Sequence, residues 1–268
     1  GVQTCALPIY LWRGDKVMRK IYAFWSIVIL ISMMLTFTVQ AIDYSEVMSE
    51  NPKYEEYVSL KEAGVIGSDV DFETWKEFLD KSSSLERELS ANVALELVYD
   101  SSDPHMARAN NSYTMTTGDV LVTNGTTSSG ILGHAGMVIL ISSTKMVLHI
   151  EGPGKTPAVI NMTSWHNRYT NAEEDSWTKI YRHTSTSVAN EAAAWNKETY
   201  MNSNATYQIN TDLHGTSKTY CSKMVWQAFY YGPSTPAATY YDAGIIGPYD
   251  LAVNIPGLRR NITIASGV

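Results

Sequence analysis

The sequence predicts an α+β fold in which a helical N-terminal region precedes a domain of short strands and two later helices. Changes in hydrophobic pattern carry this prediction. Apolar residues recur at helical spacing from Tyr44 to about Leu97, and short strand-like runs with turn signals follow from Gly118. Helical periodicity then returns in two segments, Val188 to Met201 and Ser222 to Tyr231, and Gly232-Pro233 closes the second.

Two N-terminal segments are expected to lie outside the folded part. Residues 1–17 look like a translated adapter, a non-native extension that is left out of fold reasoning. Residues 18–41 read as a signal peptide, because a basic start leads into an apolar run that ends at Val39-Gln40-Ala41. An uncleaved anchor is the alternative, since the run approaches the roughly 20 residues that span a bilayer. We expect a bacterial protein that is secreted or in the cell envelope, with no membrane span after cleavage.

The remaining chain divides at a polar linker. Residues 42–112 are expected to form two or three helices, with a break near Gly64, followed by a linker marked by Asp103-Pro104. Residues 113–268 are expected to form the main domain. A helical arm that packs on the body is favoured over a separate binding module.

Strand patterns run through the first half of the main domain. The expected strands cover 118–122, 133–141, 146–151, 158–160 and 177–181, with a last turn and strand over 245–251. A loop that contains Trp165, His166 and Arg168 is expected between the fourth and fifth of these strands. The second and third form a hairpin, and we expect its four-residue turn, Ser142 to Lys145, to be centred between Ser143 and Thr144.

The charge balance restricts the partners. The formal net charge is −7, and removal of residues 1–41 takes away four basic residues and one acidic residue, which leaves −10. An acidic surface gives no electrostatic reason to bind nucleic acid or anionic lipid, so no nucleic acid partner is expected. The chain length suits one core with a helical preface, and we expect a monomer.

A single cysteine remains after the N-terminal segments are removed. The sequence has 2 cysteines, and Cys5 lies in the excluded stretch. Cys221 therefore has no internal disulfide partner and is an intermolecular bridge, an inert buried residue or a reactive thiol. Its place at the predicted start of a helix favours the reactive thiol, because unpaired N–H groups and the helix dipole lower a thiol pKa and can stabilise an oxyanion.

A thiol nucleophile needs a base, and two of the six histidines lie inside strand patterns. His134 is the better candidate, because its small neighbours leave room for a helix and a substrate. The expected hairpin register places His134 nearest Glu151 and Pro153, so Glu151 is the expected third member that orients the base. His149 stays an alternative, because a register slip of two residues preserves the face and exchanges the two roles.

These residues resemble the circularly permuted NlpC-like cysteine hydrolases of the YiiX/YebB kind, which have a papain-like fold. The resemblance implies a central antiparallel β-sheet or half-barrel with the cysteine-bearing helix packed on it. The resemblance covers about residues 115–255 and rests on Gly118–Leu121, Gly133–Val138, Ile150–Gly154 and Tyr220–Ala228. The histidine precedes the cysteine in this chain, which is the order of the permuted relatives.

The resemblance implies a cysteine peptidase or amidase with Cys221 as nucleophile, His134 as base and Glu151 as third member. It implies cleavage of an amide or ester through a thioester, with peptidoglycan peptides as one substrate class and no cofactor. Acyl transfer stays open, because His149 also matches the position of a histidine in the lecithin-retinol acyltransferase relatives.

Two further readings come from other classes of protein. A binding module that kept the fold could use a set of aromatic residues to hold a glycan or peptide, namely Tyr220, Trp226, Tyr230, Tyr231, Tyr240 and Tyr241. A metal site could be built from His134, His149 and Cys221, although the chain lacks closely spaced Cys/His pairs.

Overall fold

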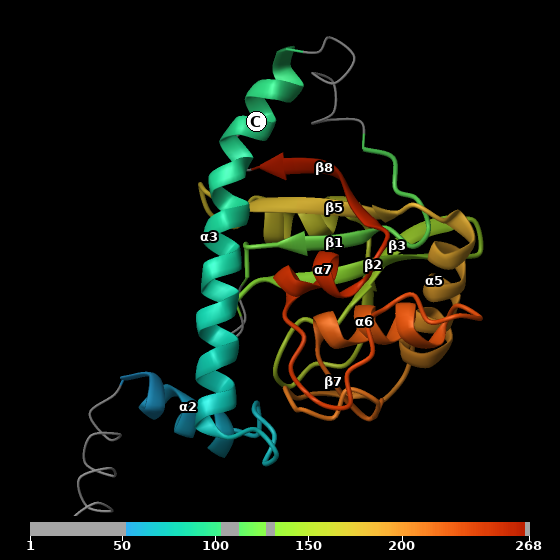
Figure 1. Cartoon of the computed structure of the whole chain (residues 1–268). Helices are drawn as coiled ribbons and strands as arrows, with labels where there is room; N and C mark the ends of the chain where they lie inside the picture. Colours follow the sequence, from blue (N-terminus) through green and yellow to red (C-terminus); the bar gives the residue numbers. More distant parts are fainter. Residues whose placement is uncertain (1–51, 103–112, 127–131, 266–268) are drawn as a thin grey trace, which may run out of the picture. The chain divides into compact units, whose positions relative to one another are not determined.

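A computed structural model describes residues 52–102, 113–126 and 132–265 (Figure 1). The segments predicted as an extension and a signal peptide, 1–17 and 18–41, lie outside the described residues. Within the part that is described, no helix combines the length and the apolar character needed to cross a membrane.

A six-stranded antiparallel sheet forms the centre of the domain, in the order β4-β3-β2-β1-β5-β8. Its strands are β1 (Val120–Thr123), β2 (His134–Ile141), β3 (Thr144–His149), β4 (Ala158–Ile160), β5 (Trp177–His183) and β8 (Leu258–Ala265). A short parallel pair, β6 (Thr206–Tyr207) and β7 (Lys218–Thr219), stands apart from this sheet. The α+β class and the antiparallel sheet predicted from the sequence are confirmed.

Both faces of the central strands are covered, which explains why β2 reads as a continuous apolar run. Every residue from His134 to Ile139 is buried. One core cluster joins Leu121, Val138 and Ile180 to the aromatic rings of Trp165 and Tyr169. Burial of each such aliphatic side chain contributes about 1.5–3 kcal/mol, so this cluster fixes the strand that carries His134.

Helices α5 (Thr186–Tyr200) and α6 (Cys221–Tyr231) pack on each other, and both pack on β2. Ser185 caps α5 by accepting a hydrogen bond from the backbone N–H of Val188. A Cβ on Gly232 would lie 2.7 Å from the Cα of Ala192, so this glycine permits the close approach of the two helices. The sequence predicted both helices and the end of the second at Gly232.

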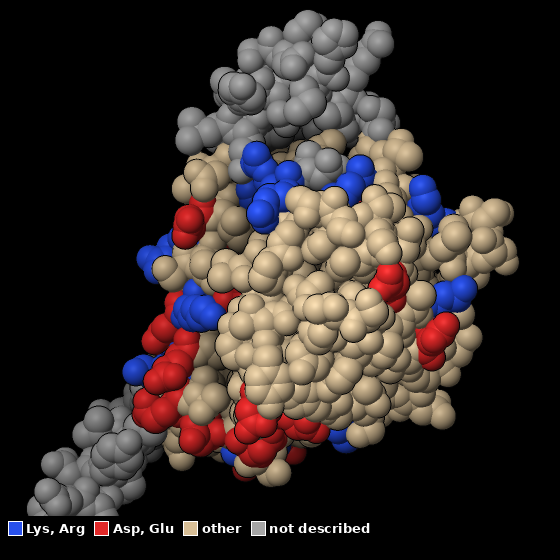
Figure 2. All heavy atoms as spheres, turned by 45° about the vertical axis from the view of Figure 1, so that its right-hand side comes forward, with Lys and Arg blue, Asp and Glu red and all other residues tan. Residues whose placement is uncertain are grey.

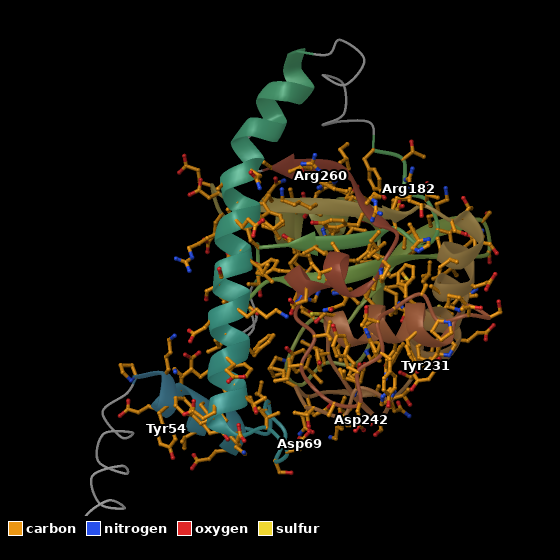
Figure 3. The ribbon with its side chains drawn as sticks, viewed as in Figure 1. Tyr54, Asp69, Arg182, Tyr231, Asp242 and Arg260 are labelled. Carbon is orange, nitrogen blue, oxygen red and sulfur yellow. The ribbon has the colours of Figure 1, made fainter. Side chains whose placement is uncertain are left out.

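The N-terminal region forms α2 (Pro52–Glu62) and α3 (Phe72–Ser102), as predicted. The turn before α3 is tied to the domain by Asp69, which accepts hydrogen bonds of 2.6 Å from both the backbone N–H and the hydroxyl of Thr211 (Figure 3). Further along α3, Ser90 accepts a bond from the indole N–H of Trp177 at 2.9 Å. These contacts make the helical region an arm packed on the body.

The predicted hairpin turn is wrong in length. Ile141 pairs with Thr144, so the turn contains only Ser142 and Ser143. Ser142 makes this tight turn with a positive φ of 55°. A turn centred between Ser143 and Thr144 would have paired Ile141 with Met146, so the true register differs from the expected one by two residues.

The segment predicted as a last turn and strand over 245–251 is helical instead. A 3₁₀ turn, η3 (Pro248–Asp250), leads directly into α7 (Leu251–Asn254). Proline suits the first position of such a turn, and the carboxylate of Asp250 accepts a bond from the N–H of Gly247 at 3.1 Å. The expected loop around Trp165 is helical as well, in α4 (Met162–Trp165) and the π-helical turn η2 (His166–Thr170).

Candidate active site

Cys221 is the first residue of α6 and is 2% exposed. The sequence predicted that the helix N-terminus would lower the pKa of this thiol. Burial instead raises the pKa of Cys221 to about 11, although hydrogen bonding by the backbone N–H of Ala135 and by Ser222 opposes that rise. The thiol is therefore protonated at neutral pH, and the cost of burying a thiolate outweighs the helix terminus.

His134 begins β2, directly before the residue whose N–H bonds the thiol sulfur. Its ring is 1% exposed, and its Nε2 atom lies 2.9 Å from Nδ1 of His149. His149 ends β3 and is 2% exposed. The fold thus gathers the sulfur, the start of β2 and a buried imidazole pair at one place.

Two aromatic residues from the helical turns enclose the imidazole pair. The ring of Trp165 stacks on that of His134 at 5.6 Å between centroids, and the ring of Tyr169 lies at 4.7 Å. The hydroxyl of Tyr169 is 3.4 Å from Nδ1 of His149. The indole N–H of Trp165 donates to the hydroxyl of Thr178 at 3.1 Å, which fixes the orientation of this wall.

Both imidazoles are neutral at physiological pH. Burial, followed by the charges of His149 and Arg168, holds the pKa of His134 well below its ordinary 6.5. Burial and the charge of Arg168 lower the pKa of His149 to about 4. With a protonated thiol beside neutral imidazoles, the resting site holds no thiolate–imidazolium pair.

Glu151, the predicted orienting residue, lies two residues beyond His149. It forms an ion pair with Arg168, with 3.0 Å between Nη1 and Oε1. The side chains of this pair are 34% and 42% exposed, in contrast to the buried imidazoles. The site therefore contains two candidates for the third member, and His149 is the one bonded to Nε2 of His134.

Sequence reasoning missed the residues that surround the imidazoles. The sequence predicts a connecting loop around Trp165 and Arg168, and Tyr169 lies in the same segment. The aromatic composition of that segment was the available signal. Its helical turns bring all three side chains to the histidines, which single-residue patterns do not predict.

The structure also bears on the metal site and the binding module considered from the sequence. Across the described ranges, no group of three or more His, Cys, Asp or Glu side chains is placed to hold a metal ion, the set of His134, His149 and Cys221 included. Of the aromatic residues considered for a binding groove, Tyr220 and Trp226 are buried in the core.

Several of the remaining aromatic residues are exposed. Tyr231, labelled in Figure 3, is 39% exposed, and Tyr240 and Tyr241 are 58% and 37% exposed. The ring nitrogens of His214 contact the hydroxyl of Tyr231 and the carbonyl of Tyr241. The face in Figure 2 has a broad middle without Lys, Arg, Asp or Glu, with acidic groups gathered at its lower left and basic groups toward the top.

Comparison with known proteins places the chain in a family. Residues 89–260, well over half of the chain, match the family described as "Lipoprotein N-acylation protein LnsA-like". The chain belongs to this LnsA-like family. It is also 30% identical over 147 residues to an uncharacterized 30.3 kDa protein of Bacillus thuringiensis. That alignment covers 52% of this chain and spans about half, 53%, of the relative.

A solved structure is also similar to this LnsA-like chain. It is the crystal structure of the metalloprotein yiiX from Escherichia coli O157:H7, which is 13% identical with a TM-score of 0.42. The match covers 57% of this chain and 99% of that chain.

Proposed function

We propose that this LnsA-like protein is a cysteine acyltransferase of the cell envelope that moves an acyl group from an ester donor to an amino group of a lipoprotein. The family description names lipoprotein N-acylation, which favours acyl transfer over the peptide hydrolysis first expected from the sequence. Cys221 is the nucleophile, His134 is the base, and the acyl group is carried between substrates as a thioester.

The observation that carries this proposal is the buried bond of 2.9 Å between Nε2 of His134 and Nδ1 of His149. If Nδ1 of His149 accepts the proton of that bond, the other ring nitrogen of His134 is left unprotonated. That nitrogen can then take the proton of a thiol. His149 is the positioning residue in this arrangement, because it sets the tautomer of the base.

The first half-reaction loads the thiol. His134 takes the proton of Cys221 as the sulfur attacks the carbonyl carbon of the ester, and a C–S bond forms. The C–O bond of the ester then breaks, and the imidazolium returns its proton to the departing alcohol. The products are the thioester on Cys221 and a free alcohol, and the imidazole is neutral again.

The second half-reaction transfers the acyl group. The uncharged amine of the lipoprotein attacks the thioester carbon, and His134 takes a proton from the nitrogen. The C–S bond breaks, and the proton passes to the sulfur. An amide and the free thiol of Cys221 result.

The burial of the site supports transfer rather than hydrolysis. A thioester is also cleaved by water, so an acyltransferase must keep water away from the loaded sulfur. Cys221, His134 and His149 are each no more than 2% exposed. The uncharged thiol of Cys221 and imidazole of His134 suit this buried site, because a buried ion pair would cost free energy.

We assign the orienting role to His149 and not to Glu151. Glu151 has an ion pair with Arg168 in a half-exposed setting. Arg168 in turn helps to hold the pKa of both imidazoles down. Glu151 therefore acts on the site through Arg168 and has a smaller expected effect on the rate than His149.

The test is a transfer assay with purified protein, phospholipid vesicles as donor and a lipopeptide with a free amino terminus as acceptor. The expected product is the lipopeptide with one more amide-linked acyl chain, detected by mass spectrometry. Cys221→Ser is the matched control and should give no product. Release of free fatty acid without acylated lipopeptide would assign the site to a hydrolase, and absence of both products would leave a binding module.

A further inference from the structure

The hydroxyl of Tyr249 has no hydrogen-bond partner among the described residues, although it is shielded from solvent. The residue is 4% exposed and lies in η3. A buried hydroxyl without a hydrogen-bond partner costs free energy, so such hydroxyls are rare unless a bound molecule or ion serves as the partner. The hydroxyl of Tyr249 is thus available to a group that the protein itself does not supply.

The fold holds this hydroxyl against the residue before His134. A Cβ placed on Gly133 would lie 2.7 Å from the hydroxyl oxygen of Tyr249 and 2.6 Å from its Cζ atom. Gly133 also has a φ of +78°, which other residues rarely adopt. Both features make glycine necessary there, and its missing side chain lets the phenol reach the start of β2.

The same hydroxyl is within electrostatic reach of the nucleophile. Burial raises the pKa of Tyr249, and the charges of Glu86 and Cys221 raise it further. The phenol therefore keeps its proton at neutral pH and is a neutral hydrogen-bond donor. Its ring is held by contact with Trp177, at 6.0 Å between centroids.

We propose that Tyr249 is a further catalytic residue, whose hydroxyl donates a hydrogen bond to the carbonyl oxygen of the acyl group as Cys221 attacks it. This inference rests on the proposed acyl transfer through Cys221. The oxygen gains negative charge when the C–S bond forms and loses it when the intermediate collapses. A donor fixed beforehand in a site without water stabilises that charge more than a solvated one.

Tyr249 complements the helix terminus at Cys221. The backbone N–H groups of the first turn of α6 have no partner within the helix, and they form one side of an oxyanion site. Tyr249 comes from the separate η3 segment and approaches from the Gly133 side. Two donors from different elements would fix the direction of the carbonyl as well as its charge.

The experiment measures acylation of Cys221 by the probe p-nitrophenyl octanoate, followed by nitrophenol release and intact mass. Tyr249→Phe keeps the ring and removes the hydroxyl, and we expect a rate of acylation about 100-fold lower with little change in KM. Its melting temperature should stay equal or rise, because an unpaired buried hydroxyl is removed.

The matched control is Tyr57→Phe. Tyr57 is similarly buried, at 7% exposed, and its hydroxyl donates to the carbonyl of Val70 at 2.8 Å. This variant loses a real hydrogen bond far from the site along the chain, so its melting temperature should fall while the acylation rate stays unchanged. Tyr249→Phe should therefore lower the acylation rate without lowering the melting temperature, and Tyr57→Phe should lower the melting temperature without lowering the rate.

A second pair of variants tests the same contact without changing the tyrosine. Gly133→Ala would push the phenol away from β2 and should lower the acylation rate. Gly64→Ala is its control, because Gly64 has a similar φ of +71° with nothing within 4 Å of an added Cβ, and its rate should be unchanged.

The outcomes separate this inference from the function on which it rests. If the wild type forms no acyl-Cys221, the acyl-transfer proposal falls and this inference falls with it. If the wild type is acylated and Tyr249→Phe is acylated equally fast, only the role of Tyr249 is overturned.

Discussion

Acidification from pH 7 to pH 5 should destabilise this protein through its buried imidazoles. The pKa of His149 is lowered from 6.5 to about 4, first by burial and then by Arg168. This difference corresponds to about 3 kcal/mol when the pH has fallen below both values, at about 1.4 kcal/mol per pKa unit. At pH 5 the loss from this one group is about 2 kcal/mol.

The sign of this pH effect depends on whether the folded or the unfolded chain binds a proton at the higher pH. Above pH 6.5 the imidazole is neutral in both the folded and the unfolded chain, so the pH has no effect. Below 6.5 the unfolded chain takes up a proton that the folded site refuses, and folding becomes less favourable until about pH 4. His134, whose pKa is also lowered, adds to the loss, whereas Glu86, whose pKa burial raises, opposes it.

Urea denaturation of the wild type and of His149→Gln at pH 7 and pH 5 measures the effect. The variant has no titrating ring at this position, so its loss of unfolding free energy between the two pH values should be smaller by about 2 kcal/mol. Equal losses in both proteins would refute the reasoning, because His149 would then be free to bind a proton in the folded state.

Three further predictions follow from the same geometry. Alkylation of Cys221 by iodoacetamide should be slow at neutral pH and rise toward pH 11 without an earlier plateau; a plateau below pH 7 would indicate a preformed thiolate. His149→Leu should lower the acyl-transfer rate about 100-fold in a kinetic assay, while His149→Gln, which keeps an acceptor for His134, should recover part of it. Gly136→Ala should lower the unfolding free energy by about 1–3 kcal/mol, because its Cβ would lie 2.6 Å from Val147; an unchanged urea midpoint would contradict the packing.

Periodicity predicted the elements that depend on burial. β4 matches its predicted bounds, 158–160, and α5 and α6 begin within two residues of the predicted starts. The two helices repeat with the helical period, and Gly232-Pro233 ends α6. Periodicity therefore predicted the α+β class, and the family resemblance supplied the packing of the cysteine helix on the sheet that carries the histidine.

Local turn chemistry set the limit of prediction at the site. The hairpin turn has only two residues, and Ser142 adopts a positive φ in it. Serine is not a sequence signal for this conformation, whereas Asn-Gly is. The β2–β3 ladder ends at the pair Met137 and Leu148, before either histidine, so the hairpin register alone does not determine whether His149 or Glu151 meets His134. The contact of Tyr249 with Gly133 joins segments more than 100 residues apart, and no local pattern predicts it.

The proposed function depends most directly on whether Cys221 carries the acyl group to an amine. The measurement is the mass of the peptide that contains Cys221 after brief incubation with p-nitrophenyl octanoate, with and without a chase by an amine-terminated lipopeptide. We predict an octanoyl adduct that hydroxylamine removes and that the lipopeptide discharges much faster than buffer does. An adduct that forms equally in Cys221→Ser, or that water discharges as fast as the lipopeptide, would contradict the account.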